Sequence, residues 1–179
     1  AAIVSKGISA LGKRFRAGML QNYSSSHIGF ISVMATENNT SINFELPTAR
    51  QTTGGQGDHS IVLDKYQSYI IANTSSQLSL IGTLVSSDKP IAVNTGAFGS
   101  SYSGLGQDYG MDQIVDASLV GSEYILIKGI AIDELETVLI IADQPNTEIN
   151  VNGNYYQSLN NTGDYTIING SEYNNGNMY

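Results

Sequence analysis

Short stretches in which apolar and polar residues alternate recur along the chain, and they predict β-strands. β-Branched and aromatic residues dominate these stretches, as expected of half-buried strands. Asn152-Gly153 and Asn169-Gly170 predict tight hairpins, because both residue types tolerate positive φ. The pattern predicts an all-β protein whose strands include 28–35, 41–46, 60–63, 68–72, 78–85, 91–93, 124–127, 138–142, 148–151 and 165–168.

One stretch departs from the strand pattern. Within residues 111–119, Ile114, Val115 and Leu119 are apolar, and Asp108 or Asp112 is in a position to cap the start of a helix. These residues predict one short helix between two groups of strands.

Two segments of the chain are similar to each other. ISVMATENNTSINF, which starts at Ile31, aligns without a gap with VLIIADQPNTEINV, which starts at Val138. Farther along, we match Tyr69 with Tyr165, which makes a connection in the second copy 11 residues shorter than in the first. Each segment predicts strand, tight turn and strand, and we interpret the pair as an internal repeat.

The repeat predicts two related β-sandwich-like halves, residues 1–107 and 122–179, with a short helical, acidic connector at 108–121. The first half continues into two further strands joined by a turn at residues 86–90, and nothing after the second copy corresponds to them. A sheet that lacks these strands would expose unpaired edges. We therefore expect that the second half is truncated at residue 179, or that another chain segment supplies the missing strands.

The composition excludes several classes of function. Charged residues make up 13% of the chain, against about 25% in a typical soluble domain, and the formal charge is -8, which disfavours nucleic acid as a partner. The absence of Cys excludes a thiolate zinc site and a Cys nucleophile. The apolar runs are far shorter than the roughly 18 residues of a membrane span, so we expect no membrane insertion. The basic cluster Lys13, Arg14 and Arg16 is interpreted as a solvated strand face.

Several motifs resemble those of a known family. The residues GKRFRAG from Gly12, the hairpin around Asn39, GTLVSSDKPIAVNTG from Gly82 and Gly-Ser-Glu-Tyr from Gly121 resemble the N-terminal domain of the IgGFc-binding protein family. Similar modules occur in very large bacterial cell-surface proteins, including gliding-motility adhesins of Bacteroidetes. The Asn-rich, Cys-free, acidic composition fits that branch.

The resemblance implies a secreted or cell-surface module. Its implied partners are other domains of the same polypeptide and an extracellular protein or glycan surface. The family's Asp-x-x-x-Glu-Gln pattern is represented by Asp112 and Asp116, with Ala117 in place of the amide.

Three acidic residues form a candidate metal site. Asp108, Asp112 and Asp116 are spaced four residues apart, so on a helix they would share one face. Calcium, which takes six to eight oxygen ligands, would relieve the repulsion between these charges. Helix capping and a solvated face explain the same spacing, and both interpretations stay open. We expect no other cofactor.

Three aromatic residues are the candidate ligand-binding residues. Phe98, Tyr102 and Tyr109 lie in or beside a glycine-rich segment, and tyrosine, serine and glycine are typical of adaptable binding surfaces. The alternative is that the aromatic rings pack across neighbouring strands.

The sequence shows no catalytic arrangement. Asp133, Glu134 and Glu136 supply acids in what we interpret as a charged turn, and no Gly-x-Ser-x-Gly pattern is present. We therefore expect a non-catalytic structural or adhesive module and no enzyme. A specific carbohydrate- or immunoglobulin-binding domain is the alternative, and a glycoside hydrolase is a more remote one.

Overall fold

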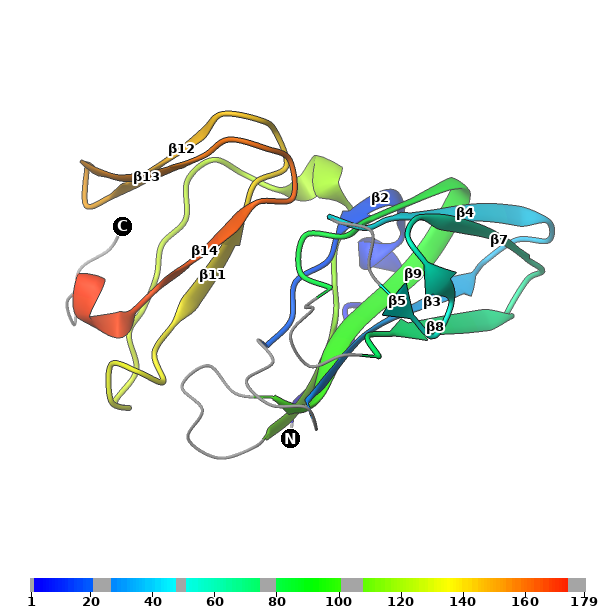
Figure 1. The fold of residues 1–179 in the computed structure, drawn as a ribbon, viewed down its shortest axis with the longest axis horizontal. Coiled ribbons are helices and arrows are strands. Elements are labelled where there is room, and N and C mark those ends of the chain that lie inside the picture. The colour runs from blue at the N-terminus through cyan, green and yellow to red at the C-terminus, as the bar shows by residue number, and fades with distance from the viewer. Residues whose placement is uncertain (1, 21–26, 48–50, 75–79, 101–107, 174–179) are drawn as a thin grey trace.

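The chain is mostly β-strand, which confirms the predicted all-β class. The structure is a computed structural model that describes residues 2–20, 27–47, 51–74, 80–100 and 108–173. Its strands form a partly closed, barrel-like sandwich, and Figure 1 shows a larger lobe that contains β1–β10 beside a smaller one that contains β11–β14. The elements are β1 (Ala2–Val4), η1 (Gly7–Ala10), β2 (Gly12–Arg16), β3 (Ile28–Ala35), β4 (Thr40–Glu45), β5 (Gln51–Thr52), β6 (Gly55–Gln56), β7 (His59–Leu63), β8 (Ser68–Ala72), β9 (Leu84–Ser100), β10 (Asp108–Gln113), η2 (Ala117–Leu119), β11 (Val138–Ile141), β12 (Thr147–Val151), β13 (Asn154–Leu159), β14 (Tyr165–Ile168) and η3 (Gly170–Glu172).

Strand β9 organises the larger lobe. It is 17 residues long and pairs with β2, β3, β4 and β10 in one eight-stranded sheet. Because side chains alternate across a strand, one face of each strand can enter a common core. That core includes Phe15 from β2, Phe44 from β4 and Val85 and Val93 from β9, all fully buried.

The smaller lobe has two two-stranded sheets, β11–β14 and β12–β13. Its core contains Ala142, Ile149, Leu159, Ile168 and Tyr173. Strand β11 is covered on both faces: Val138 and Ile140 face this core, while Leu139 and Ile141 pack against the core of the larger lobe.

The two similar sequence segments adopt the same hairpin geometry. In each, an Asn has positive φ, 53° at Asn39 and 56° at Asn146, immediately before the second strand. The Thr that follows donates from its Oγ1 to the backbone carbonyl three residues back, at 2.8 Å in both segments. Ala35 and Ala142, near the end of the first strand in each, are both buried. The residues that the segments share are therefore the residues that shape the turn.

The strand register corrects one detail of the sequence comparison. Met34 pairs with Ser68 across β3–β8, whereas Ile141, the counterpart of Met34, pairs with Tyr165 across β11–β14. Tyr165 therefore corresponds to Ser68, and its predicted match with Tyr69 is wrong by one residue. Such a shift turns a side chain to the opposite face of the sheet.

The predicted helix at 111–119 is largely wrong. Met111–Gln113 belong to β10, which pairs with β9, and only Ala117–Leu119 form a 3₁₀ turn. Pairing with β9 outweighs the weak helical pattern of this stretch. The three aspartates therefore do not share a helix face.

The predicted turn at residues 86–90 is also wrong, because β9 runs through it. Lys89 Nζ donates to the carbonyls of Asn38 and Asn39, at 2.6 and 2.9 Å, and Asp88 accepts from the N–H of Ser41 at 2.8 Å. These polar residues bind the β3–β4 turn as β9 passes from β4 to β3. The Ser-Asp-Lys-Pro segment thus holds β9 against that turn through hydrogen bonds.

Smaller differences from the predicted elements have local causes. The Asn152-Gly153 hairpin is confirmed, with φ of 57° and 75°. Asn169 instead has φ of -80° and caps η3, accepting from the N–H of Ser171. Residues 124–127 are not a strand, and β13, whose polar residues hide its alternation, was not predicted.

Within the described ranges, no helix is long and apolar enough to cross a membrane.

Candidate binding surface and lobe junction

Two of the three predicted ligand-binding residues come together at the end of the β9–β10 pair. The rings of Phe98 and Tyr109 have centroids 6.2 Å apart in an edge-to-face arrangement. Phe98 also stacks on Phe30 of β3 at 5.0 Å. Phe30 is buried, while Phe98 and Tyr109 are 53% and 55% exposed. The third predicted residue, Tyr102, lies outside the described residues.

A β-bulge places these two rings beside each other. Between the pairs Ala97–Gly110 and Ser100–Asp108, two residues of β9 face one residue of β10. The extra residue is Gly99, whose φ of 70° is open to glycine but unfavourable for most other residues. The signal for this bulge in the sequence is the glycine directly after Phe98.

The three predicted calcium ligands have different surroundings. Asp112 forms an ion pair with Lys6, and both side chains are partly exposed. Asp116 precedes η2 and accepts hydrogen bonds from the backbone N–H groups of Lys13, Arg14 and Ser118, at 2.7, 3.1 and 2.8 Å. The side chain of Asp108 lies outside the described part of the chain. Calcium binding at these residues stays a prediction.

The partners of Asp116 change its acidity. Desolvation acts to raise its pKa, but the hydrogen bonds from Ser118, Arg14 and Lys13 outweigh it and lower the pKa to about 2. The carboxylate is therefore a strong acceptor that fastens η2 to β2.

Gln113 anchors the N-terminal segment, a role that the sequence did not suggest. It is 6% exposed. Its Oε1 accepts from the N–H groups of Lys6 and Gly7 at 2.7 and 3.0 Å, and its Nε2 donates to the Gly7 carbonyl at 3.1 Å. Its position inside a predicted helix concealed this role.

A salt bridge joins the two lobes and corrects the interpretation of the basic cluster. Arg14 and Arg16 of β2 donate to Asp143, which follows β11, at 2.7 and 3.4 Å. The hydrogen bond from Arg14 is the main cause that lowers the pKa of Asp143. Burial lowers the pKa of Arg16, whose side chain is 12% exposed. These two arginines are therefore junction residues, whereas Lys13 remains exposed.

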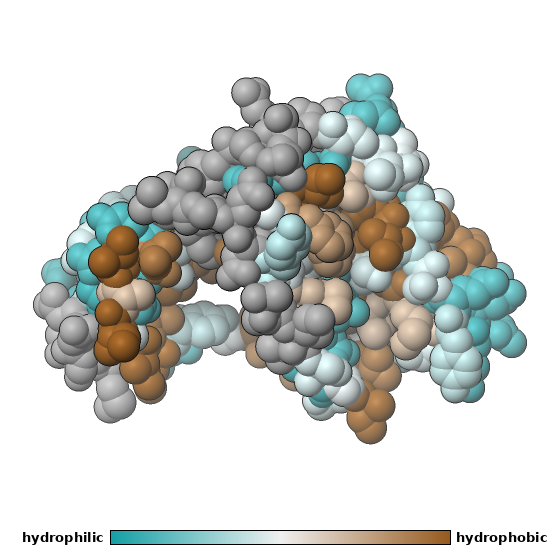
Figure 2. Space-filling model, turned by 90° about the horizontal axis from the view of Figure 1, so that it is seen from below, coloured by the Kyte–Doolittle hydropathy of each residue, from teal (hydrophilic) through white to brown (hydrophobic). Residues whose placement is uncertain are grey.

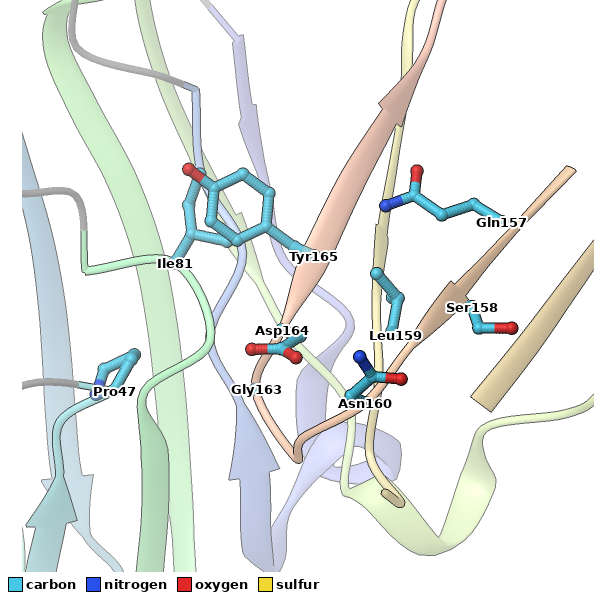
Figure 3. Close-up of a pocket in the computed structure, with 9 residues that line it drawn as sticks. All are labelled: Pro47, Ile81, Gln157, Ser158, Leu159, Asn160, Gly163, Asp164 and Tyr165. Carbon is cyan, nitrogen blue, oxygen red and sulfur yellow. The ribbon is translucent and has the colours of Figure 1, made fainter. Parts of the chain in front are cut away.

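A polar pocket of about 430 Å³ opens at the same junction (Figure 3). The ring of Tyr165, from the smaller lobe, lies against Ile81 of the larger lobe. Near them, Gly82 has φ of 86° and lies so close to the Gly163 carbonyl that a Cβ would collide with it. The pocket is lined by Pro47, Ile81, Gln157, Ser158, Leu159, Asn160, Gly163, Asp164 and Tyr165.

The comparison with protein families assigns nearly the whole chain. A model of the family described as IgGFc binding protein matches residues 1–176, which include both lobes. The search of curated proteins and the search of solved structures each give no match. The family is described by binding and not by a reaction. The chain therefore belongs to the IgGFc-binding protein family.

Proposed function

We propose that this chain is a non-catalytic binding module, and that Phe98 and Tyr109 form part of its contact surface. The observation that carries the proposal is their exposure, because two large rings in edge-to-face contact at the end of the β9–β10 pair are more than half open to solvent. Aromatic side chains offer large contact areas at small entropic cost and are enriched at binding sites. Tyr102, in the segment between β9 and β10, is proposed as a third contributor.

The proposed setting is a large secreted or cell-surface protein, of which a gliding-motility adhesin is one example. The family match and the acidic, Cys-free composition support it. The proposed partners are neighbouring domains of the same polypeptide and an extracellular protein or glycan. In this proposal residues 1–107 and 122–179 are two copies of one β unit, which their shared hairpin geometry supports. Residues 108–121 link the two copies, and the first part of this link is β10 of the larger lobe's sheet.

The kind of ligand that the protein binds distinguishes a general adhesive module from a specific recognition domain. Surface plasmon resonance with immobilised IgG Fc and a glycan array would measure both ligand types with the same protein. We expect saturable binding to at least one of them. A specific immunoglobulin-binding domain would bind Fc alone, whereas a lectin would bind a related set of glycans.

The contact residues are tested by the double substitution Phe98→Ala and Tyr109→Ala. We expect it to weaken binding at least about tenfold, because removal of a buried hot-spot residue costs on the order of 2 kcal/mol. Tyr155→Ala is the matched control, since this tyrosine is 64% exposed on β13 of the other lobe. Equal affinities for the double variant and the natural protein, with the same melting temperature, would contradict the proposed surface.

A further inference from the structure

One edge of β11 has no strand beside it in the described part of the chain. Among the strands that the structure describes, β11 pairs with β14 alone. The N–H and C=O of Ala142 bond to Asp164 and Gly163, on the β14 side, at 2.9 and 2.8 Å. Backbone groups alternate between the two edges of a strand, so those of Leu139 and Ile141 point away from β14. These groups form a free hydrogen-bonding edge.

In the larger lobe the corresponding edge is filled by β9. Ala35, the counterpart of Ala142, likewise bonds towards β8, through Gln67 and Tyr66. Ser32 and Met34, the counterparts of Leu139 and Ile141, therefore face β9, where the register pairs them with Asn94 and Ala92. The pairing of β3 with β9 thus shows which kind of strand fits this edge in the larger lobe.

A second observation comes from the segment that precedes β11. Of the 17 large hydrophobic side chains exposed in the described residues, eight lie between Leu119 and Leu135. The backbone groups of residues 122–130 make no hydrogen bond to any other described residue. In Figure 2 apolar surface is visible on the smaller lobe as well as on the larger one.

In the larger lobe β9 covers the segment that corresponds to these exposed residues. Gly121-Ser122-Glu123-Tyr124 repeats the Gly-x-x-aromatic pattern of β2, in which Phe15 pairs with Val85 of β9. Phe15 is fully buried, whereas Tyr124 is 60% exposed. Such an exposed apolar segment marks an interaction site in a folded protein.

We propose that the smaller lobe binds one extended strand from polypeptide outside residues 1–179, in the position that β9 takes in the larger lobe. The strand runs antiparallel to β11 and covers the exposed apolar segment before it. Its main chain provides hydrogen bonds to Leu139 and Ile141, and its alternate apolar side chains enter the core of the smaller lobe.

The turn between β11 and β12 adds a chemical requirement. In the larger lobe Lys89 donates to the carbonyls of Asn38 and Asn39, and the corresponding carbonyls in the smaller lobe are those of Pro145 and Asn146. Asn146 has the same positive φ as Asn39, so its turn presents these carbonyls in the same way. The bound strand therefore alternates apolar and polar residues, and it has a Lys where it passes the β11–β12 turn, as in Ser-Asp-Lys-Pro of β9.

A synthetic peptide with the sequence of residues 82–96, GTLVSSDKPIAVNTG, which contains most of β9, tests the proposal on the 179-residue protein. We expect saturable binding by fluorescence anisotropy. In hydrogen exchange, the amides of Leu139 and Ile141 should gain protection, while those of Ser32 and Met34 stay unchanged, because β9 already covers them. Binding should persist in the Phe98→Ala, Tyr109→Ala variant, which separates this site from the proposed contact surface.

Matched peptides make the test specific. N-Methylation of Ala92 blocks the edge that would face Ile141 and should weaken binding at least about tenfold. N-Methylation of Val93, whose groups face the opposite edge as the bond from Ile114 to its carbonyl shows, should cost less. Replacement of Lys89 by Ala in the peptide should also weaken binding.

Three results would overturn the proposal. The first is the absence of saturable binding up to about 1 mM peptide. The second is equal binding of a scrambled peptide. The third is a concentration-dependent dimer in sedimentation, in which hydrogen exchange shows Leu139 and Ile141 protected without peptide. The last result would assign the edge to a second copy of the chain.

Discussion

Several aspartates in this chain accept hydrogen bonds from backbone N–H groups of strands and turns. The bonds run to Asp58 from Leu46, to Asp64 from Asn39, to Asp88 from Ser41 and to Asp116 from Lys13, Arg14 and Ser118. Such N–H groups lack ladder partners, and a carboxylate satisfies them well. Capping and anchoring therefore account for these four of the chain's 16 acidic residues at the scale of single residues.

The substitution Asp116→Ala tests the strongest of these anchors. It should lower the free energy of unfolding at pH 7 by about 1–2 kcal/mol, because three backbone N–H groups lose their acceptor. The folded-state pKa of about 2 lies below the usual value, so this stability is present above about pH 4 and disappears as the pH falls through 2. Urea unfolding at both pH values measures it, with the exposed Glu134→Ala as control. An equal loss at pH 7 and at about pH 2 would refute the charge argument.

The calcium prediction for Asp108, Asp112 and Asp116 has its own test. A bound ion stabilises the folded state, so EDTA should lower the Tm by about 3 °C or more, and added calcium should restore it. Differential scanning calorimetry measures the shift. A Tm that is the same with EDTA and with calcium would leave these residues with their structural roles alone.

At the scale of elements, β9 differs most from its predicted form. Its apolar alternation is interrupted by Ser86-Ser87-Asp88-Lys89-Pro90, which in isolation is typical of a turn. In the structure these polar groups are satisfied by the β3–β4 turn, so the strand continues and pairs with β2, β3, β4 and β10. Contacts distant in sequence thus override a local turn pattern.

The substitution Lys89→Ala tests the contact between β9 and the β3–β4 turn. It should lower the free energy of unfolding by about 1 kcal/mol, since two charge-assisted hydrogen bonds to backbone carbonyls are lost at a partly exposed site. Chemical unfolding measures the effect. Lys13→Ala is the control, because its exposed side chain has no described partner. If both variants lose the same stability, the bond from Lys89 to the turn is not what fastens β9.

At the scale of the whole molecule, the two lobes meet through both polar and apolar contacts. Leu139 and Ile141 pack against the core of the larger lobe, and Arg14 and Arg16 bind Asp143 beside them. A contact that buries apolar side chains and pairs partly buried charges favours one relative placement of the lobes. The proposed strand site and the proposed aromatic surface lie on different lobes of this arrangement.

The substitution Asp143→Ala tests the junction. It leaves the charge of the largely buried Arg16 without its acidic partner. The free energy of unfolding should therefore fall by about 1–3 kcal/mol, and the Tm should fall with it. In the natural protein the pKa of Asp143 is lowered, so its carboxylate stabilises the fold near neutral pH. This stabilisation is lost as the carboxylate is protonated below about pH 4. Small-angle scattering should also show a wider distribution of shapes. Glu123→Gln, an exposed acid, is the control. An unchanged scattering profile and Tm would show that the apolar contacts suffice.

The sequence by itself determined the β class, most strand positions, the family and the correspondence of the two hairpins. These features depend on local patterns, such as apolar alternation in β3 and the Asn-Thr pair that shapes each turn. It also indicated that Phe98 and Tyr109 belong together, because a glycine-rich segment links them.

Only the tertiary structure decided the roles that depend on distant partners. It made the Ser-Asp-Lys-Pro segment part of β9, placed Met111–Gln113 of the predicted helix in β10, and put Arg14 and Arg16 at a lobe junction. It also showed that one edge of β11 has no strand beside it among the described residues. In each case the deciding contact joins residues far apart in the chain, and local propensity carries no information about such pairs.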